Sequence, residues 1–175
     1  MTFFRDVAVK YLFPDEIRAD IYDVDLEALK AAGFKGLILD VDNTLKPPGP
    51  GGPGCGVLAW LEAARGLGFG ICLLSNSRRR RVLRFSSGLG VYAISLARKP
   101  AAAGFLKAIR LLGCEPERVC VIGDQVFTDV LGARRLGLKA IYTRPVTAKE
   151  EFTVRLKRIP EARVIRLAMK NGVRP

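Results

Sequence analysis

Residues 36–45 read GLILDVDNTL, a continuously apolar run followed at once by a polar segment with two carboxylates. An apolar run this short, bounded by turn residues, is typical of a strand buried on both faces of a sheet. While the backbone stays extended, Asp40 and Asp42 face the same way, so both would reach one reacting group. The stretch predicts a central strand whose carboxyl end carries chemistry.

Apolar runs alternate with helical patterns from this strand to Tyr142. Further strands are predicted at residues 69–74, 91–94, 119–122 and 138–142, and helices at 57–65, 78–85, 101–112 and 128–136. Continuous apolar strands that alternate with helices predict an α/β fold, in which a parallel sheet is covered on both faces. In such sheets function lies at the carboxyl ends of the strands.

At 175 residues the chain has the length of a single domain, and we expect residues 36–143 to form its core. Residues 1–35 are predicted to be an N-terminal helical extension. Residues 144–175 are predicted to be a basic C-terminal extension that mixes helix with a short strand. Residues 46–54, KPPGPGGPG, are predicted to be a loop because proline and glycine prevent regular structure.

A second Asp-Val-Asp triplet, residues 23–25, shows how much context matters. It runs directly into the helical pattern LEALK, so Asp25 is predicted to cap a helix within Pro14–Ala32. Asp40 and Asp42 have a structural alternative of their own, since Asp and Asn commonly form strand-to-loop turns. These two residues alone do not distinguish a structural turn from a catalytic site, so the polar residues at the other strand ends have to be considered.

A second acidic cluster follows the predicted strand VCVI. It contains Gly123-Asp124-Gln125, with Thr128 and Asp129 just beyond. Thr128 and Asp129 would equally suit a helix start, as a cap and as a favourable charge. Two acidic strand ends side by side are costly unless a cation binds there. A ligand set made only of oxygen, without His or thiolate spacing, predicts Mg²⁺.

Two further polar pairs are expected at the same edge of the sheet. Ser75-Asn76 ends the run LGFGICLL, and Lys99-Pro100 opens the pattern AAAGFLKAI. The structural alternatives are a helix cap for the first pair and a solvated lysine before a first-turn proline for the second. Together the pairs supply hydrogen-bond donors and one fixed positive charge, which phosphoryl transfer requires.

The chain carries 29 basic and 17 acidic side chains, a net charge of +12, and residues 144–175 hold half of the excess. This balance favours anionic partners such as phosphorylated metabolites, nucleic acid or anionic lipid headgroups, or else forms a solubilising surface. The absence of histidine excludes His-based triads and His-liganded metals. Catalysis therefore has to rest on carboxylates, lysine or hydroxyls.

The four cysteines form no Cys-x-x-Cys pair, and we expect reduced thiols in a cytosolic protein. No apolar run approaches the roughly 18–20 residues that span a bilayer, and residues 1–6 lead into acidic sequence rather than a signal peptide. We expect a cytoplasmic location, with peripheral contact at the inner membrane face as the closest approach to lipid.

Four motifs in this order resemble the haloacid dehalogenase (HAD) superfamily, subfamily IIIA. They are D-x-D-N-T at 40–44, S-N at 75–76, K-P at 99–100 and G-D-Q-x-x-T-D at 123–129. The resemblance spans residues 36–143 and implies a three-layer Rossmann-like fold with a five-stranded parallel sheet in the order 5-4-1-2-3. The short links after Leu45 and Ile94 leave no room for a cap domain.

The resemblance also implies a role for each motif residue. Asp40 would be the nucleophile that forms an aspartyl-phosphate, and Asp42 would protonate the leaving group and later activate water. The implied Mg²⁺ ligands are Asp40, the Asp42 backbone carbonyl, Asp124 and Asp129. The implied phosphate-binding residues are Asn43, Thr44, Ser75, Asn76 and Lys99.

The segment YDVDLEAL before GFKGLILD is similar to the YqeG-type branch of this family, which includes phosphatidylglycerophosphate phosphatases. Ser77 departs from the pattern, since another asparagine is expected there. An uncapped site suits a large or membrane-embedded phosphomonoester. The arginines at 78–81 (Arg78, Arg79, Arg80 and Arg81) are either solvated or in contact with anionic lipid headgroups.

The resulting expectation is a phosphatase that converts phosphatidylglycerophosphate to phosphatidylglycerol. One alternative is a phosphatase for a soluble sugar, nucleotide or protein phosphate. Another is a basic nucleic-acid-binding or scaffold protein on the same fold, although the sequence has no recognisable RNA-binding motif or paired aromatic platform.

Overall fold

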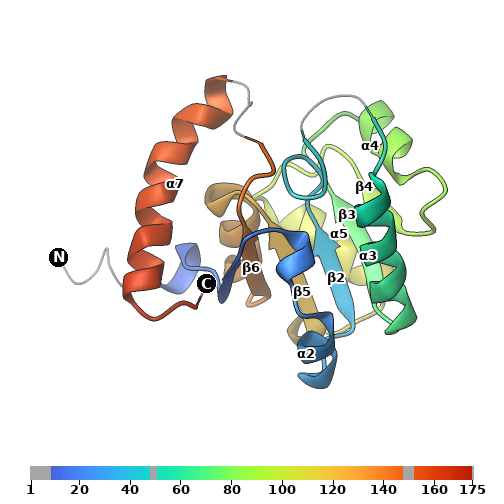
Figure 1. Ribbon diagram of the computed structural model, residues 1–175, viewed down its shortest axis with the longest axis horizontal. Helices are drawn as coiled ribbons and strands as arrows, with labels where there is room; N and C mark the ends of the chain where they lie inside the picture. The colour runs from blue at the N-terminus through green and yellow to red at the C-terminus, as the bar shows by residue number, and fades with distance from the viewer. Residues whose placement is uncertain (1–8, 48–50, 148–151, 175) are drawn as a thin grey trace.

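The computed structural model describes residues 9–47, 51–147 and 152–174, and Figure 1 shows a sheet with helices on both faces. The six strands of the described residues are all parallel, in the order β1-β6-β5-β2-β3-β4. They are β1 (Glu16–Arg18), β2 (Gly36–Leu39), β3 (Gly70–Leu74), β4 (Tyr92–Ile94), β5 (Val119–Gly123) and β6 (Lys139–Thr143).

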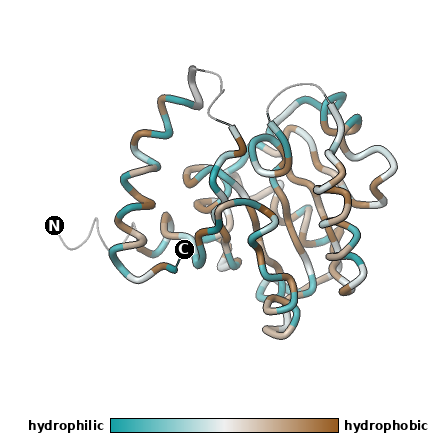
Figure 2. Tube along the Cα trace, in the orientation of Figure 1, coloured by the Kyte–Doolittle hydropathy of each residue, from teal (hydrophilic) through white to brown (hydrophobic). Residues whose placement is uncertain are grey.

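Strand β2 lies in the middle of the sheet because its residues are apolar and buried on both faces. It pairs with β3 on one side and β5 on the other. Successive side chains point to opposite faces, so Leu37 and Leu39 join one core cluster and Ile38 joins the other. Figure 2 shows the hydrophobic residues concentrated along these central strands.

Helices cover the two faces in two groups. The cluster that contains Leu37 is covered by α2 (Leu26–Ala31) and α3 (Cys55–Gly66), and α4 (Arg79–Ser86) adds Phe85 to it. The cluster that contains Ile38 is covered by α5 (Ala102–Leu112) and α6 (Leu131–Arg135). Short helical turns are also formed by η1 (Ile21–Asp23), η2 (Pro116–Arg118) and η3 (Val126–Val130).

Helix α7 (Phe152–Lys170) lies beyond β6, at one side of the molecule (Figure 1). Val164 and Ile165 on this helix pack against the core cluster that contains Ile38. None of the helices in the described part of the chain is both long and apolar enough to cross a bilayer.

The predicted α/β class, the five core strands and the four core helices are confirmed. The predicted order 5-4-1-2-3 corresponds to β6-β5-β2-β3-β4. Only residues 95–101 lie between β4 and α5, and residues 40–54 between β2 and α3, so neither link contains a cap domain. Within the second link, residues 51–54 are irregular as predicted, and residues 48–50 lie outside the described residues.

The helix predicted over Pro14–Ala32 is wrong in its first part, where β1 adds a sixth strand beside β6. Asp15 anchors this strand: its N–H donates to the Ala140 carbonyl (2.8 Å), and its carboxylate accepts the Ala140 N–H (2.7 Å). Of the three residues in β1, Ile17 alone is buried. A strand this short shows no periodicity in the sequence, so propensity could not identify it.

The second Asp-Val-Asp triplet has the capping role that its context predicts. The Asp25 carboxylate accepts the Ala28 N–H (2.8 Å) and caps α2. Asp23 ends the short turn η1 and accepts the Ala19 N–H (3.3 Å). Both aspartates are exposed.

The mixture of helix and strand predicted for the C-terminal extension is wrong. Its described residues contain the 19-residue helix α7 and no strand. After α7 the chain returns to the sheet edge, where the Ile17 N–H donates to the Arg174 carbonyl (3.1 Å). The extension thus lies along the β1–β6 side of the sheet rather than forming a separate tail.

Candidate active site

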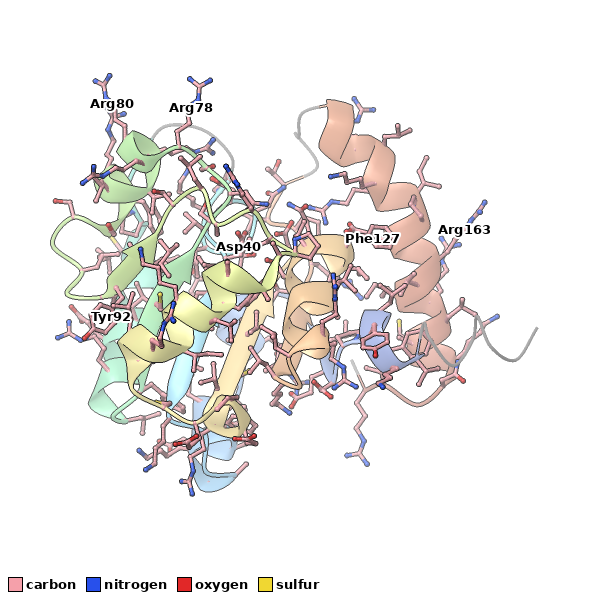
Figure 3. All side chains as sticks on the ribbon, turned by 180° about the vertical axis from the view of Figure 1, so that it is seen from behind. Asp40, Arg78, Arg80, Tyr92, Phe127 and Arg163 are labelled. Carbon is pink, nitrogen blue, oxygen red and sulfur yellow. The ribbon has the colours of Figure 1, made fainter. Side chains whose placement is uncertain are left out.

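The carboxyl ends of β2, β3 and β5 bring the predicted residues together. Asp40, Ser75 and Asp124 directly follow these three neighbouring strands, and all three side chains are buried. The Asp40 N–H still continues the ladder by donating to the Ile122 carbonyl (3.0 Å). Figure 3 shows Asp40 at this edge of the sheet.

Lys99 bridges two carboxylates at the centre of the site. Its Nζ donates to Asp40 Oδ1 (2.5 Å) and to Asp129 Oδ1 (2.6 Å), and all three residues are buried. Burial opposes the lysine charge, but the attraction of Asp129 and Asp40 outweighs it and raises the pKa of Lys99 above its usual value. Lys99 is therefore a fixed cation against both carboxylates.

Asn76 holds the backbone of Lys99 in place. Its Oδ1 accepts the Lys99 N–H (2.7 Å) and its Nδ2 donates to the Lys99 carbonyl (3.2 Å). The amide of Asn76 thus positions the lysine. Ser75 directly precedes Asn76 at the end of β3, and its Oγ accepts the Ser77 N–H (3.0 Å).

Asp40 is a buried carboxylate with a raised pKa. Burial raises the pKa of Asp40 to about 6, and the positive charge of Lys99 opposes the rise. Its second oxygen accepts from Thr44 Oγ1 (3.2 Å), and the same hydroxyl lies 3.2 Å from Asp124 Oδ1. Thr44 therefore links the acidic ends of β2 and β5.

Asp124 is held by Arg158, a residue that the sequence did not single out. Arg158 on α7 pairs with the Asp124 carboxylate and donates to the Asp124 carbonyl (2.5 Å). Burial and the nearby carboxylates of Asp40 and Asp129 raise the pKa of Asp124, while Arg158 acts in the opposite direction. The C-terminal extension thus contributes a charge to the site.

Glu161 fixes Arg158 in this position. One Glu161 oxygen accepts from Arg158 Nη1 (3.0 Å) and the other accepts the Phe127 N–H (3.2 Å). In the sequence these two residues look like an ordinary surface pair, three positions apart on a helix. Their burial depends on where α7 packs, which no local pattern indicates.

Three carboxylates form a cluster that suits a metal ion. Oxygens of Asp40, Asp124 and Asp129 lie within 4.8 Å of one another. Lys99 and Arg158 offset two of the three negative charges, and one remains. A buried, all-oxygen set with residual negative charge fits a hard divalent cation such as Mg²⁺.

Asp42 has separate partners from Asp40. Its oxygens accept from Ser77 Oγ (2.6 Å) and Arg81 (2.6 Å), and Lys46 Nζ lies 3.7 Å away. The regular alternation of the strand ends with β2 at Leu39, so the two aspartates meet different donors. The Asp42 side chain is also less buried, at 22% exposure against 7% for Asp40.

The four arginines after Ser77 do not act alike. Arg81 points back to Asp42, whereas Arg78 and Arg80 extend away from the molecule (Figure 3). Sequence reasoning treated the run as a unit and did not foresee the pair with Asp42. Arg81 lies four residues before the buried Phe85 and therefore on the same, inner side of α4.

Asn43 shapes the loop after β2. It adopts a left-handed backbone conformation (φ 69°), which Asn tolerates better than most residues. Its side-chain oxygen accepts the Thr147 N–H (3.1 Å), and its carbonyl accepts the Val146 N–H (3.0 Å). Its side chain therefore ties this loop to the segment after β6.

Asp129 lies in η3, a π-helical turn that begins two residues before the predicted helix start. Its Oδ2 accepts the Gln125 N–H (3.2 Å), so its carboxylate reaches back toward β5. Thr128 is buried inside the turn and is not the cap. A Cβ on Gly123 would lie 2.5 Å from Asp129 Cγ, which explains why glycine ends β5.

Known proteins that are similar to this chain include hydrolases and phosphatases. A family model described as HAD-hydrolase-like matches residues 96–158. The Bacillus subtilis protein named probable phosphatase YqeG is 36% identical over 163 residues, which cover 93% of this chain and 95% of that protein.

More distant relatives extend the comparison. The chloroplastic phosphatidylglycerophosphate phosphatase 1 of Chlamydomonas reinhardtii is 32% identical over 166 residues, covering 84% of this chain and 59% of the algal protein. The chain thus spans little more than half of that relative. A crystal structure of an uncharacterized Listeria monocytogenes protein matches 68% of this chain and 85% of its own, with a TM-score of 0.55 at 18% identity. This likeness shows the fold.

Proposed function

Since this chain belongs to the HAD-like phosphatases, in the branch of YqeG, we propose that it is a Mg²⁺-dependent phosphomonoester hydrolase with Asp40 as its nucleophile. The observation that carries the proposal is the convergence of Asp40, Lys99, Asp124 and Asp129 at one strand edge. A buried carboxylate beside a fixed cation and two further carboxylates suits phosphoryl transfer better than a structural turn.

The reaction has two steps that share one proton carrier. An Asp40 oxygen forms a bond to phosphorus while the bond to the leaving-group oxygen breaks, and Asp42 gives that oxygen a proton. Asp42 then removes a proton from water, whose oxygen attacks the phosphorus and releases Asp40 and inorganic phosphate. One water is consumed, and both aspartates return to their starting states.

The different surroundings of the two aspartates support this division of roles. Asp40 is the more buried and is aligned by Lys99 and Thr44. Asp42 is closer to solvent, where a leaving group and a water molecule have access to it. Ser77 and Arg81 hold its carboxylate in position.

The remaining motif residues bind the phosphoryl group or position those that do. Lys99 supplies positive charge, and Ser75 and Thr44 supply hydroxyls for the phosphoryl oxygens. Asn76 and Asn43, whose side chains bond to backbone groups of the protein, keep the surrounding loops in place.

Mg²⁺ is the proposed metal, with Asp40, Asp124, Asp129 and the Asp42 backbone carbonyl as its ligands. When bound, Mg²⁺ neutralises part of the charge on the phosphoryl group. Arg158 orients the Asp124 carboxylate from outside the cluster. The buried ligand set supports this assignment.

The proposed substrate is phosphatidylglycerophosphate, met by a cytoplasmic protein in peripheral contact with the inner membrane face. The links on either side of the site contain no cap domain, so a substrate embedded in a bilayer has access. Arg78 and Arg80 point outward from the same edge and would face anionic headgroups (Figure 3). A relative that is named for this activity adds support.

The test is Mg²⁺-dependent phosphate release from phosphatidylglycerophosphate in mixed micelles, beside p-nitrophenyl phosphate and a panel of soluble phosphomonoesters. We expect kcat/KM for the lipid to exceed that for every soluble substrate by at least about tenfold. Turnover of soluble substrates alone would contradict the proposed lipid substrate and would leave the proposed phosphatase mechanism unchanged. No turnover of any substrate, together with salt-dependent RNA binding, would favour the basic scaffold.

A further inference from the structure

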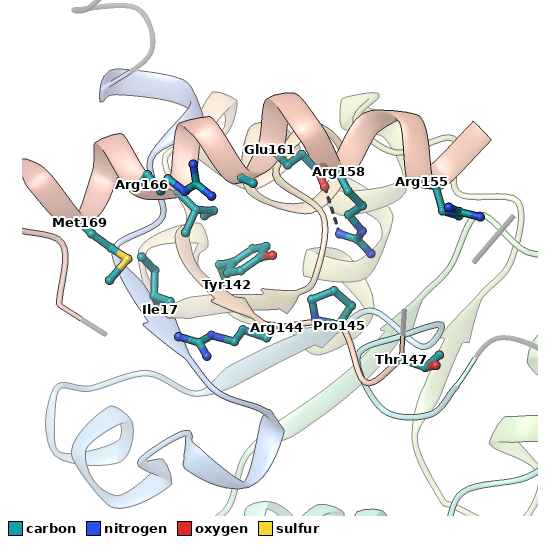
Figure 4. A pocket seen from close by; sticks show the side chains of 12 residues that line it. Ile17, Tyr142, Arg144, Pro145, Thr147, Arg155, Arg158, Glu161, Arg166 and Met169 are labelled. Carbon is teal, nitrogen blue, oxygen red and sulfur yellow. Dashed lines mark hydrogen bonds and ion pairs between the residues drawn. The ribbon is translucent and has the colours of Figure 1, made fainter. Parts of the chain in front are cut away.

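A cavity of about 530 Å³ lies between α7 and the strands β1 and β6 (Figure 4). Ile17 and Tyr142 form its floor, and both are buried. Arg166 and Met169 line it from α7, and Arg144 lines it from the segment after β6. None of these residues belongs to the four sequence motifs.

One end of this groove touches the candidate active site. Arg158 lines that end and pairs with the carboxylate of Asp124. Thr147 lies at the same end and donates its N–H to Asn43 in the loop after β2. Figure 4 shows Met169 at the opposite end, so the groove leads from the reacting centre along α7.

The charge of the groove is strongly one-sided. Its lining contains four arginines and one acidic residue, and that residue, Glu161, pairs with Arg158. Among the described residues, no carboxylate forms an ion pair with Arg144, Arg155 or Arg166. The groove thus presents several positive charges that the described part of the chain does not neutralise.

Polarity changes along the groove in a definite order. Nearest the site lies the Arg158 end, then Arg144 and Arg166 on opposite sides of Tyr142, then the apolar side chains of Ile17 and Met169 (Figure 4). An anionic amphiphile has the same order of groups: a reacting phosphomonoester, a second phosphate as a diester, and acyl chains. A small sugar or nucleotide phosphate would leave the apolar end unfilled.

We propose that this groove binds the leaving-group part of an anionic, amphiphilic phosphomonoester. Arg144 and Arg166 hold its phosphodiester, and Ile17, Tyr142 and Met169 contact the start of its acyl chains. The proposal rests on the proposed phosphatase function and adds the residues that select the leaving group.

The experiment uses three substrates that differ only beyond the reacting phosphate. They are soluble dihexanoyl phosphatidylglycerophosphate below its micelle concentration, its deacylated headgroup, and p-nitrophenyl phosphate. Without a lipid surface, attraction to a membrane does not contribute. The variants are the double change Arg144→Gln with Arg166→Gln, the single change Met169→Gln, and the control Arg163→Gln, which removes a charge that points away from the groove on α7 (Figure 3).

The arginine double variant should lower the preference for both phosphodiester substrates over p-nitrophenyl phosphate, measured as the ratio of kcat/KM values, by about tenfold. Met169→Gln should lower the preference for the dihexanoyl substrate over the deacylated headgroup by roughly threefold. The Arg163→Gln control should keep both wild-type ratios, since it lines no part of the groove.

Two results would overturn the proposed role of the groove in binding the leaving group and would leave the proposed phosphatase function standing. In one, the wild type prefers the phosphodiester substrates and the arginine double variant keeps that preference. In the other, Arg163→Gln lowers the preference as much as the double variant does, so that general surface charge explains the effect. A wild type that hydrolyses p-nitrophenyl phosphate without preferring the dihexanoyl substrate would overturn the groove and the lipid substrate together.

Discussion

Among single residues, Lys99 stabilises the negative charge that is buried in the site. It bonds Asp40 and Asp129 at once, and Arg158 on α7 pairs with Asp124. Even so, burial keeps the pKa of Asp40 near 6 and that of Asp124 raised. The metal-free site therefore holds carboxylates that the fold alone does not fully stabilise in their charged forms.

This imbalance predicts how the stability of the metal-free protein depends on pH. The pKa of Asp40 is about 6 in the fold against 3.8 for an unperturbed aspartate, so the fold favours the protonated form. Asp40 therefore adds most to the free energy of unfolding below pH 4. This stabilisation is lost as pH rises through 6, and the total loss is roughly 3 kcal/mol at most. The pKa of Asp124 is also raised, so its contribution to the free energy of unfolding falls with rising pH as well.

The measurement is urea unfolding in EDTA between pH 4 and 7, for the wild type and for Asp40→Asn. We expect the free energy of unfolding of the wild type to fall relative to the variant as pH rises. Added Mg²⁺ should restore the wild type at pH 7, since it binds only the folded site. A wild type that gains stability over the variant in EDTA as pH rises would contradict the assigned pKa shift.

The motif residues were predictable because their positions follow from the sheet. Asp40, Ser75 and Asp124 each follow an apolar run, and parallel strands bring such ends together. Arg158 and Glu161 were not predictable, because they reach the site through the path of α7. The contact of Arg81 with Asp42 was hidden among four identical arginines.

Among the secondary-structure elements, β5 and η3 are joined by a contact that only glycine permits. Gly123 has an ordinary backbone conformation, yet a Cβ there would lie 2.6 Å or less from three atoms of Asp129. The close approach lets the Asp129 carboxylate reach Lys99. Gly123 is therefore needed because its missing side chain leaves room for the Asp129 carboxylate.

Gly123→Ala should displace Asp129 and weaken the site. We expect Mg²⁺ affinity and kcat/KM to fall by about tenfold to a hundredfold, as for lost supports of metal ligands. Activity as a function of Mg²⁺ concentration measures both. The matched control is Gly66→Ala in α3, where a Cβ meets nothing within 4 Å, and it should keep full activity. Unchanged Mg²⁺ dependence in Gly123→Ala would contradict the proposed role of Asp129.

The elements that sequence patterns missed are those that depend on distant partners. The core strands and helices have clear periodicity, and they were predicted within a few residues of their bounds. Strand β1 is three residues long and exists through its pairing with β6. Helix α7 contains Pro160 and so departs from an ordinary helical pattern.

At the scale of the whole molecule, the two extensions close one side of the fold. The N-terminal segment adds β1 beside β6, and the chain after α7 returns to bond with Ile17. Glu161 is nearly fully buried between α7 and η3, although burial raises its pKa. The basic C-terminal segment is therefore an integral layer against the site.

Glu161→Ala tests whether α7 is held in this way. The change leaves the Phe127 N–H without its acceptor and removes one of the two carboxylates that pair with Arg158, so we expect a loss of about 1–3 kcal/mol in the free energy of unfolding. Glu161→Gln keeps an acceptor for Phe127 and should recover part of the loss. Urea unfolding of the three proteins gives the comparison. Equal stability of Glu161→Ala and the wild type would mean that this contact does not hold α7.

The most direct test of the central claim is Mg²⁺-dependent phosphate release from p-nitrophenyl phosphate by Asp40→Asn. The control is Asp25→Asn in the other Asp-Val-Asp triplet, because asparagine caps a helix as well as aspartate does. We predict that Asp40→Asn lowers kcat/KM at least about a thousandfold, while Asp25→Asn keeps the wild-type value. Release of phosphate by Asp40→Asn at the wild-type rate would contradict the account.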